Sequence, residues 1–393
     1  MNKTNISSAA FADTKPHYNL LDGLRGAAAL MVVWYHVFEG FAFAEGVNGV
    51  EGGGLIDVFN HGYLAVDFFF MLSGFVISYA YDDRWNRMSM LDFFKRRLIR
   101  LHPMLVMGAV IGAIAFIAGG NLRWDGTQTP MGWVAVALLL TCCFIPARMG
   151  APYEVRGNGE MFPLNGPSWS LFFEYIGNIC YALFIRRFSN KVLGVWVAVT
   201  GVAWAWFAVT NVSGYEMIGV GWALDTMNFC GGFLRMIFPV SLGMLLARHF
   251  KPLRVRGIFW MAIVLLFVLF SVPFFPGEGS LCVNGVYEMF CIMVMFPLIV
   301  WLAASGTTTD KASTGVCKFL GDISFPLYIV HYPVMYLFYQ WLIDKQVYTL
   351  AGAGLMVPLV YALNVVMAYA CLKLYDEPVR HRLAAVFHVG KKN

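Results

Sequence analysis

The residues of this sequence that could do chemistry begin in an apolar run, 20–40, that contains three ionisable side chains: Asp22, Arg25 and His36. Arg25 and His36 are eleven positions apart, about three helical turns, so a helix would present both on one face about 16 Å apart along its axis. An ionisable group at membrane depth costs roughly 2.5–3.5 kcal/mol. We therefore expect this face to line a polar cavity within a helix bundle.

Asp67 is the candidate partner of His36. It lies in the apolar run 60–81, at a depth similar to that of His36. A carboxylate that accepts one imidazole N–H fixes the tautomer and raises the basicity of the other ring nitrogen, as acyl-transfer chemistry requires. The alternative is that Asp67 only satisfies a backbone group or an arginine.

A basic cluster, Lys95, Arg96, Arg97 and Arg100, begins the third apolar run. Contact with lipid headgroups and control of membrane topology explain such a cluster without any ligand. The alternative is phosphate binding, because guanidinium groups on adjacent helical turns can hold a diphosphate.

Three further side chains are candidates for substrate binding. Glu174 and Trp169 belong to the run 168–185 and are expected in its outer half, whereas His331 is expected near mid-membrane in the run 323–342. The alternatives are a tryptophan of the membrane interface and a structural, hydrogen-bonded histidine.

Arg235 and Glu288 are expected near the outer ends of their helices. They are either further buried ionisable groups of the same pattern or interfacial charges that reach water. The eight cysteines are scattered and have no metal-type spacing, so they are expected to pack as small apolar residues. We expect no metal ion.

The composition is that of a polytopic membrane protein. Of 393 residues, 59% are hydrophobic and only 13% are charged, which excludes a water-soluble globular domain. The mean hydropathy of +0.64 agrees. The formal net charge of +5 reflects the excess of basic residues in cytoplasmic loops, and we expect no binding of nucleic acid.

Apolar runs of about twenty residues predict an all-α bundle of ten transmembrane helices. Their expected ranges are 20–40, 60–81, 98–119, 168–185, 193–212, 230–247, 257–275, 283–304, 323–342 and 350–373. The run 131–145 is short for a crossing and is expected to be re-entrant or interfacial. The basic clusters then fall on one side, which places both termini in the cytoplasm.

The chain divides into three expected parts: a cytoplasmic tail at 1–19, one transmembrane domain at 20–375 and a second cytoplasmic tail at 376–393. We expect no cleaved signal peptide, because the first apolar run is too long for one. The outer segment 120–167 is rich in Gly and Pro, and serves either as a lid or binding surface or as an ordinary surface loop.

Six segments resemble the membrane-bound acyltransferase 3 family, in the order in which that family has them. They are LDGLRGAAALMVVWYH, GYLAVDFFFMLSGFVIS, FFKRRLIRLHP, NGPSWSLFFEY, LGDISFPLYIVHYPV and YDEPVR. Members of this family transfer acyl groups, often acetyl, from acyl-CoA to sugars and other acceptors. The chain differs from the common pattern at His102, to which we assign no role.

The resemblance implies that His36 is the catalytic histidine and Arg25 the basic member of its motif. It also implies that Arg96, Arg97 and Arg100 lie where the CoA donor approaches. We expect His36 to act as a general base on an acceptor hydroxyl, or to carry the acyl group transiently.

The expected partners are acyl-CoA, especially acetyl-CoA, a saccharide or lipid-linked glycan acceptor, and membrane lipids. The expected place is the inner or plasma membrane, and the expected acceptor is a cell-envelope or exported saccharide. A transporter or flippase is the alternative from another class, because buried charges around a cavity also serve transport. An enzyme with a lipid-phosphate donor is a further alternative.

Overall fold

The computed structural model describes residues 18–50, 60–253, 255–275 and 281–389, and this part of the chain is almost entirely helical. Its α-helices are α1 (Asn19–Asn48), α2 (Ala65–Tyr81), α3 (Met90–Ala118), α4 (Met131–Cys142), α5 (Ser168–Leu183), α6 (Asn190–Val209), α7 (Thr226–His249), α8 (Ile258–Phe270), α9 (Val283–Phe290), α10 (Phe296–Ser305), α11 (Lys311–Lys345), α12 (Leu350–Ala353), α13 (Met356–Cys371) and α14 (Glu377–Val386). The expected all-α fold is confirmed.

Short 3₁₀ and π-helical turns and one pair of short strands lie between the α-helices. A 3₁₀ turn, Gly62–Leu64, leads into α2, and another, Ile185–Arg187, follows α5. Two π-helical turns, Cys291–Met295 and Leu372–Asp376, connect α9 to α10 and α13 to α14. The strands β1 (Val255–Arg256) and β2 (Gly306–Thr307) pair in parallel, with Val255 opposite Gly306.

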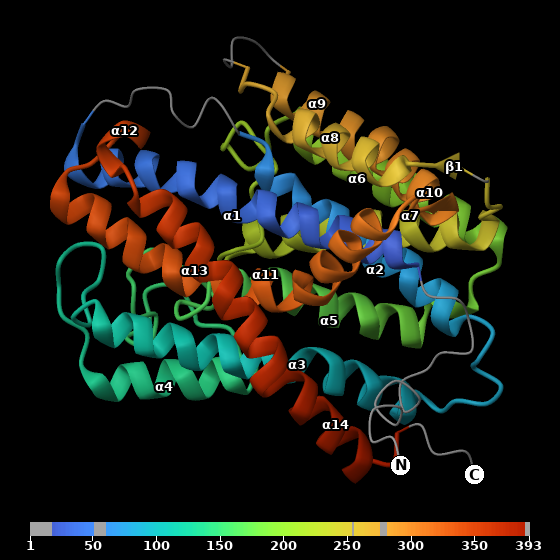
Figure 1. Ribbon diagram of the computed structural model, residues 1–393, viewed down its shortest axis with the longest axis horizontal. Helices are drawn as coiled ribbons and strands as arrows, with labels where there is room; N and C mark the ends of the chain where they lie inside the picture. Colours follow the sequence, from blue (N-terminus) through green and yellow to red (C-terminus); the bar gives the residue numbers. More distant parts are fainter. Residues whose placement is uncertain (1–17, 51–59, 254, 276–280, 390–393) are drawn as a thin grey trace.

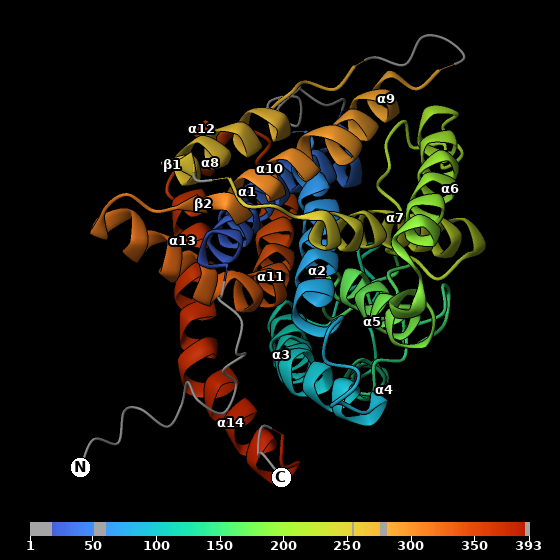
Figure 2. The same ribbon diagram turned by 90° about the vertical axis from the view of Figure 1, so that its right-hand side faces the viewer.

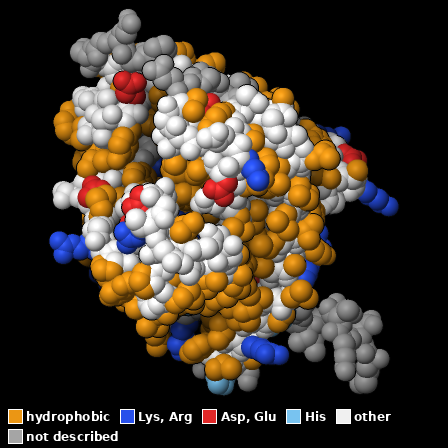
Figure 3. Space-filling view, turned by 90° about the vertical axis from the view of Figure 1, so that its left-hand side faces the viewer, with side chains coloured by type: hydrophobic (Ala, Val, Ile, Leu, Met, Phe, Trp, Pro, Cys, Tyr) orange, Lys and Arg blue, Asp and Glu red, His pale blue; other side chains and the backbone are white. Residues whose placement is uncertain are grey.

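Seven helical segments of the described residues are long and apolar enough to cross a membrane. They are Asn19–Asn48, Gly62–Tyr81, Met90–Ala118, Asn190–Val209, Thr226–His249, Val283–Ser305 and Met356–Val386. Hydrophobic side chains also cover much of the outer face seen in Figure 3. The chain is therefore a multi-pass membrane protein.

The expected count of ten spans is not confirmed. Helices α5 and α8 form where spans are expected, but they have only 16 and 13 residues. Helix α11 has 35 residues and is largely buried, yet it contains four Tyr, two Pro and one His, which lower its hydropathy. Helix α4 has 12 residues, about 18 Å of helix, so it is short for a crossing. Its re-entrant or interfacial placement stays a prediction.

The expected tail 1–19 lies almost entirely outside the described residues, whereas most of the expected tail 376–393 is described. Residues 1–17 and 390–393 are not among the described residues. Within the expected tail 376–393, the chain continues as helix α14, and Glu377 pairs with Lys373 at 2.5 Å. The domain limits stay predictions.

The centre of the bundle is the pair α1 and α11, which lie side by side in Figures 1 and 2, with α2 and α7 packed together next to them. Glycines allow this close contact. A Cβ atom at Gly26 would lie 2.0 Å from the Leu320 carbonyl oxygen of α11, and one at Gly74 would lie 2.0 Å from the Val240 carbonyl oxygen of α7. Small residues let membrane helices approach closely, so these contacts set the positions of the helices that hold the site.

We predict that Gly26→Ala destabilises the protein by about 1–3 kcal/mol, because the new methyl group meets backbone rather than a movable side chain. The measurement is the thermal unfolding midpoint in detergent. Gly46→Ala is the matched control, since Gly46 is on the same helix and has open space at its Cβ position. Equal midpoints for the two variants would contradict the prediction.

Candidate active site

His36 projects from α1 into a cavity of about 460 Å³. Its Nδ1 lies 2.6 Å from Oε2 of Glu39, one turn further along the same helix. An ionised carboxylate only accepts hydrogen bonds, so Nδ1 carries the proton and Nε2 keeps its lone pair. The Tyr339 hydroxyl lies 2.8 Å from the same carboxylate oxygen and holds it in place. The arrangement can therefore supply a general base or a nucleophile.

Aromatic rings fix the plane of the His36 imidazole. The His331 ring stacks on it with centroids 5.3 Å apart, and the Tyr332 ring meets it edge-on at 4.7 Å. His331 is fully buried, and its Nδ1 lies 2.9 Å from the Tyr328 carbonyl oxygen, to which it donates. His331 does not line the cavity. Its placement suits support of the catalytic candidate rather than contact with a substrate.

Asp67 does not contact His36, and this expectation was wrong. Its carboxylate is fully buried and is held by Arg235 of α7, whose Nη2 donates to Oδ2 at 2.8 Å and whose Nε donates at 3.1 Å. The reason is electrostatic: a buried guanidinium requires a paired carboxylate at low dielectric. Glu39 occupies the role that the sequence suggested for Asp67.

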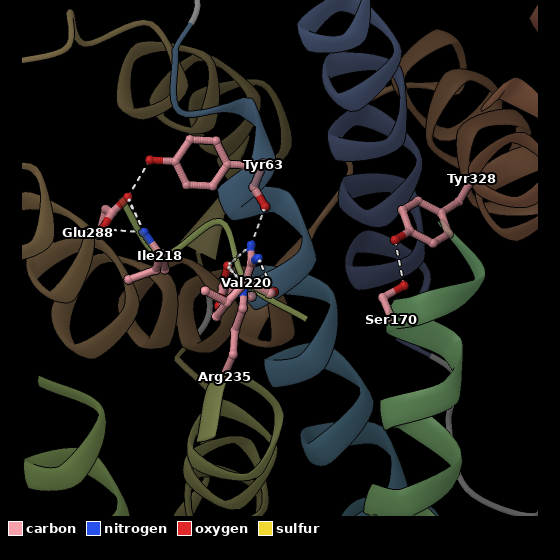
Figure 4. A network of polar contacts seen from close by, with 8 residues as sticks. Tyr63, Ser170, Ile218, Val220, Arg235, Glu288 and Tyr328 are labelled. Atoms are coloured by element: carbon pink, nitrogen blue, oxygen red, sulfur yellow. Dashed lines mark hydrogen bonds and ion pairs between the residues drawn. The ribbon is translucent and has the colours of Figure 1, made fainter. Parts of the chain in front are cut away.

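Arg235 and Glu288 are buried, so the alternative of interfacial charges that reach water was also wrong. Figure 4 shows both in one network of polar contacts. Arg235 donates further to the carbonyl oxygens of Val220 at 3.2 Å and Tyr63 at 2.9 Å. Glu288 accepts a hydrogen bond from the Tyr63 hydroxyl. The backbone N–H of Ile218 donates to both Glu288 carboxylate oxygens, at 3.1 and 3.2 Å.

This network fixes the connection between α6 and α7 over the cavity. Met217 and Gly219, next to the bonded Ile218 and Val220, line the cavity wall. Since Arg235 is neutralised by Asp67, this ion pair adds no net charge to that wall.

A second, smaller cavity of about 80 Å³ lies beside the first and is cationic. It brings together Arg25, Arg97 and Arg100, as the basic motif suggested. Arg25 Nη1 donates to Asp22 Oδ1 at 3.2 Å, and Arg97 Nη2 donates to Glu174 Oε1 at 2.6 Å. Ser73 Oγ donates to the same Glu174 oxygen at 2.9 Å. The two carboxylates formally balance two of the three guanidinium charges, so the cavity keeps a net positive charge. A cluster of guanidiniums in a partly enclosed site suits an anionic, phosphate-bearing ligand.

The remaining candidates divide between the two cavities. Trp169 lines the cavity of His36, and its ring lies 5.2 Å from the Arg235 guanidinium. Glu174 does not line the cavity of His36. Its carboxylate forms an ion pair with Arg97 in the cationic cavity. Arg96 lines neither cavity.

The segment 120–167 contributes Trp124, Asn158 and Glu160 to the wall of the cavity of His36, and its role in binding stays a prediction. The Tyr336 hydroxyl donates to Glu160. The Arg156 guanidinium lies 3.4 Å from the centroid of the Tyr336 ring. Burial raises the pKa of the Glu160 carboxyl to about 7, so at neutral pH this group is only partly ionised.

Sequence reasoning missed Glu39, Glu160 and the four tyrosines of α11 that line the cavity, Tyr328, Tyr332, Tyr336 and Tyr339. The spacing of Glu39, three residues after His36 on the same helical face, was a usable signal. Glu160 had none, because it lies in irregular backbone. Among the described residues, no group of three or more His, Cys, Asp or Glu is placed to hold a metal ion.

The described structure is a bundle of membrane helices with a histidine–carboxylate pair beside an arginine cluster. The comparisons with known proteins identify its family. Residues 18–371 match the family model described as an acyltransferase domain, and the chain belongs to the acyltransferase 3 family.

Three relatives illustrate the family. The chain is 34% identical to "Protein 2 in picA locus" of Rhizobium radiobacter over 47% of this chain and 90% of the relative. It is 26% identical to "Acyltransferase MdmB" of Streptomyces mycarofaciens, over 80% of this chain and 78% of the relative. It is 23% identical to "Peptidoglycan O-acetyltransferase OatA" of Listeria monocytogenes, over 80% of this chain but only 49% of the relative. No solved structure matches the chain.

We predict that Asp67→Asn destabilises the fold by about 3–5 kcal/mol, because Arg235 is left buried without its counter-charge. The measurement is the thermal unfolding midpoint in detergent, with Glu39→Gln as the comparison. Glu39 is more exposed and its loss should lower the midpoint much less. A normal midpoint for Asp67→Asn would show that the pair does not support the fold.

Proposed function

We propose that this protein is an O-acyltransferase that moves an acyl group, most often acetyl, from cytoplasmic acyl-CoA to a hydroxyl of a cell-envelope or exported saccharide. The observation that supports this most is the pairing of two cavities. One holds the imidazole of His36, the other holds three arginines, and both share Val66 and Tyr328 in their walls.

The donor belongs in the cationic cavity. Arg25, Arg97 and Arg100 would bind the phosphates of CoA, and the pantetheine arm would run along α1 towards His36. Eleven residues of helix separate Arg25 from His36, about 16 Å, which is similar to the length of that arm when extended. The donor side then faces the cytoplasm, where acyl-CoA is made, and both chain termini lie on that side.

The transfer step uses the lone pair of His36 Nε2. Nε2 takes the proton of the acceptor hydroxyl as its oxygen attacks the thioester carbonyl. The C–S bond then breaks, CoA leaves as the thiolate, and the imidazolium returns the proton to the sulfur. Glu39 stabilises the imidazolium through its bond to Nδ1. Transient acyl-histidine is the alternative route, with attack by Nε2 in a first step.

The acceptor belongs in the cavity of His36. Its wall combines the rings of Trp124, Trp169 and Trp222 with tyrosine hydroxyls and the Asn158 amide. Flat apolar rings and hydrogen-bonding groups together suit a sugar, which has both apolar C–H faces and hydroxyls. The name of the Listeria relative, a peptidoglycan O-acetyltransferase, supports a glycan acceptor. The names of the relatives favour acyl transfer over the transporter alternative.

We predict that His36→Ala lowers CoA release from acetyl-CoA by about 10²–10⁴-fold, the usual contribution of a general base. The measurement is thiol release by the full-length protein in membranes that contain its acceptors. His249→Ala is the matched control, since His249 is exposed at the end of α7 and lines neither cavity. Undiminished release by His36→Ala would refute the proposed base.

We predict that Arg100→Gln raises the KM for acetyl-CoA several-fold with little change in kcat, because Arg100 binds the donor without touching the reacting atoms. Arg96→Gln is the matched control on the same helix, and its KM should stay at the wild-type value because Arg96 lies outside the cavity. An equal KM for both variants would show that the arginine cavity does not bind the donor.

A further inference from the structure

Three helices meet at the wall between the cationic cavity and the cavity of His36. Val66 of α2 and Tyr328 of α11 line both cavities, and Ser170 of α5 lines the cationic one. The hydroxyls of Tyr328 and Ser170 lie 2.6 Å apart and are hydrogen-bonded, as Figure 4 shows. The wall is therefore closed by a specific contact between two side chains from different helices.

The wall lies next to the catalytic candidate. His331 donates to the backbone carbonyl of Tyr328, and its ring stacks on that of His36. Because Tyr328 borders both the arginine cavity and the cavity of His36, an acyl group that moves from one to the other must pass this side chain.

The tyrosine ring is held on two sides. The Phe69 ring meets it edge-on with centroids 5.3 Å apart, and Ser170 bonds its hydroxyl. Ser170 is itself anchored, because its Oγ lies 3.0 Å from the Pro167 carbonyl oxygen. Ser170 and Tyr328 are only 5% and 9% exposed, so widening the passage requires a movement of packed groups.

We propose that Val66 and the Tyr328–Ser170 pair form a constriction that selects the acyl group by length and admits short chains to His36. This inference rests on the proposed function, since it assumes an acyl-CoA donor in the cationic cavity. A longer chain would have to displace the Val66 side chain or break the hydroxyl pair. Enzymes that discriminate by one methylene in an apolar site typically do so by about 10–200-fold.

The test compares three valine-to-alanine variants of the full-length protein in membranes that contain its acceptors. Val66→Ala widens the constriction. Val76→Ala enlarges only the cationic cavity, and Val32→Ala enlarges only the cavity of His36. The measurement is the ratio of kcat/KM for acetyl-CoA to that for butyryl-CoA. Only His36-dependent CoA release is counted, that is, total release minus the release by the His36→Ala variant.

We expect Val66→Ala to lower the acetyl-to-butyryl ratio about tenfold or more, and the two control variants to keep the wild-type ratio. Tyr328→Phe is the second variant, because it retains the ring and removes only the bond to Ser170. Like Val66→Ala, it should lower the acetyl-to-butyryl ratio, by raising kcat for butyryl-CoA rather than by lowering the KM for butyryl-CoA.

The outcomes separate this inference from the proposed function. If His36-dependent release persists and both Val66→Ala and Tyr328→Phe keep the wild-type ratio, the constriction is refuted and the acyltransferase proposal stands. An equal shift in all three valine variants would also refute it, because cavity volume rather than the constriction would set the preference. If the wild type releases no CoA from either donor, the proposed function fails and the inference fails with it.

Discussion

The ion pair between Arg235 and Asp67 is the interaction on which the rest of this structure depends. It joins α7 to α2 with both partners buried, at a depth where an unpaired charge is very costly. Because Arg235 has more N–H groups than one carboxylate can accept, it also binds the carbonyls of Val220 and Tyr63. The pair thereby fixes the α6–α7 connection and the start of α2, which together form one wall of the cavity of His36. It also holds Asp67 away from His36, whose imidazole pairs with a different carboxylate.

Helix α1 supplies that carboxylate and also sets the distance between the two cavities. A single rigid helix presents Arg25 in one cavity and His36 with Glu39 in the other, so their separation follows from the helical rise and not from the packing of different segments. The close contact of α1 with α11 at Gly26 then places the His331 and Tyr332 rings against His36. The geometry of the site is thus a property of two helices in contact.

The sequence was enough to predict the membrane class, the family and the gathering of Arg25, Arg97 and Arg100, because hydropathy, motif order and helical spacing are local properties. It was not enough to assign partners. Hydropathy gives the approximate depth of a residue but not the direction in which it projects around the helix axis, so Asp67 was expected beside His36 and Glu174 at the substrate site on the same side of the membrane. In the structure both face arginines of other helices, Arg235 and Arg97, because buried guanidiniums compete more strongly for carboxylates than a neutral imidazole does. The count of ten spans is not confirmed, and α11 shows a related reason: it is buried by its neighbours and can contain Tyr, His and Pro that a lipid-facing helix would exclude.

Charge neutralisation has a consequence for recognition in the cavity of His36. Arg235 is compensated by Asp67, Glu39 is engaged by His36 and Tyr339, and the pKa of Glu160 near 7 leaves that carboxyl only partly ionised at neutral pH. The cavity therefore offers little free charge of either sign, and its selectivity must come from aromatic faces and neutral hydrogen-bonding groups. The cationic cavity next to it has the opposite character. Two cavities of such different character are separated by a wall in which Tyr328 lies, with its ring packed against Phe69 and its hydroxyl bonded to Ser170. Because both contacts are buried, the wall keeps the two environments apart.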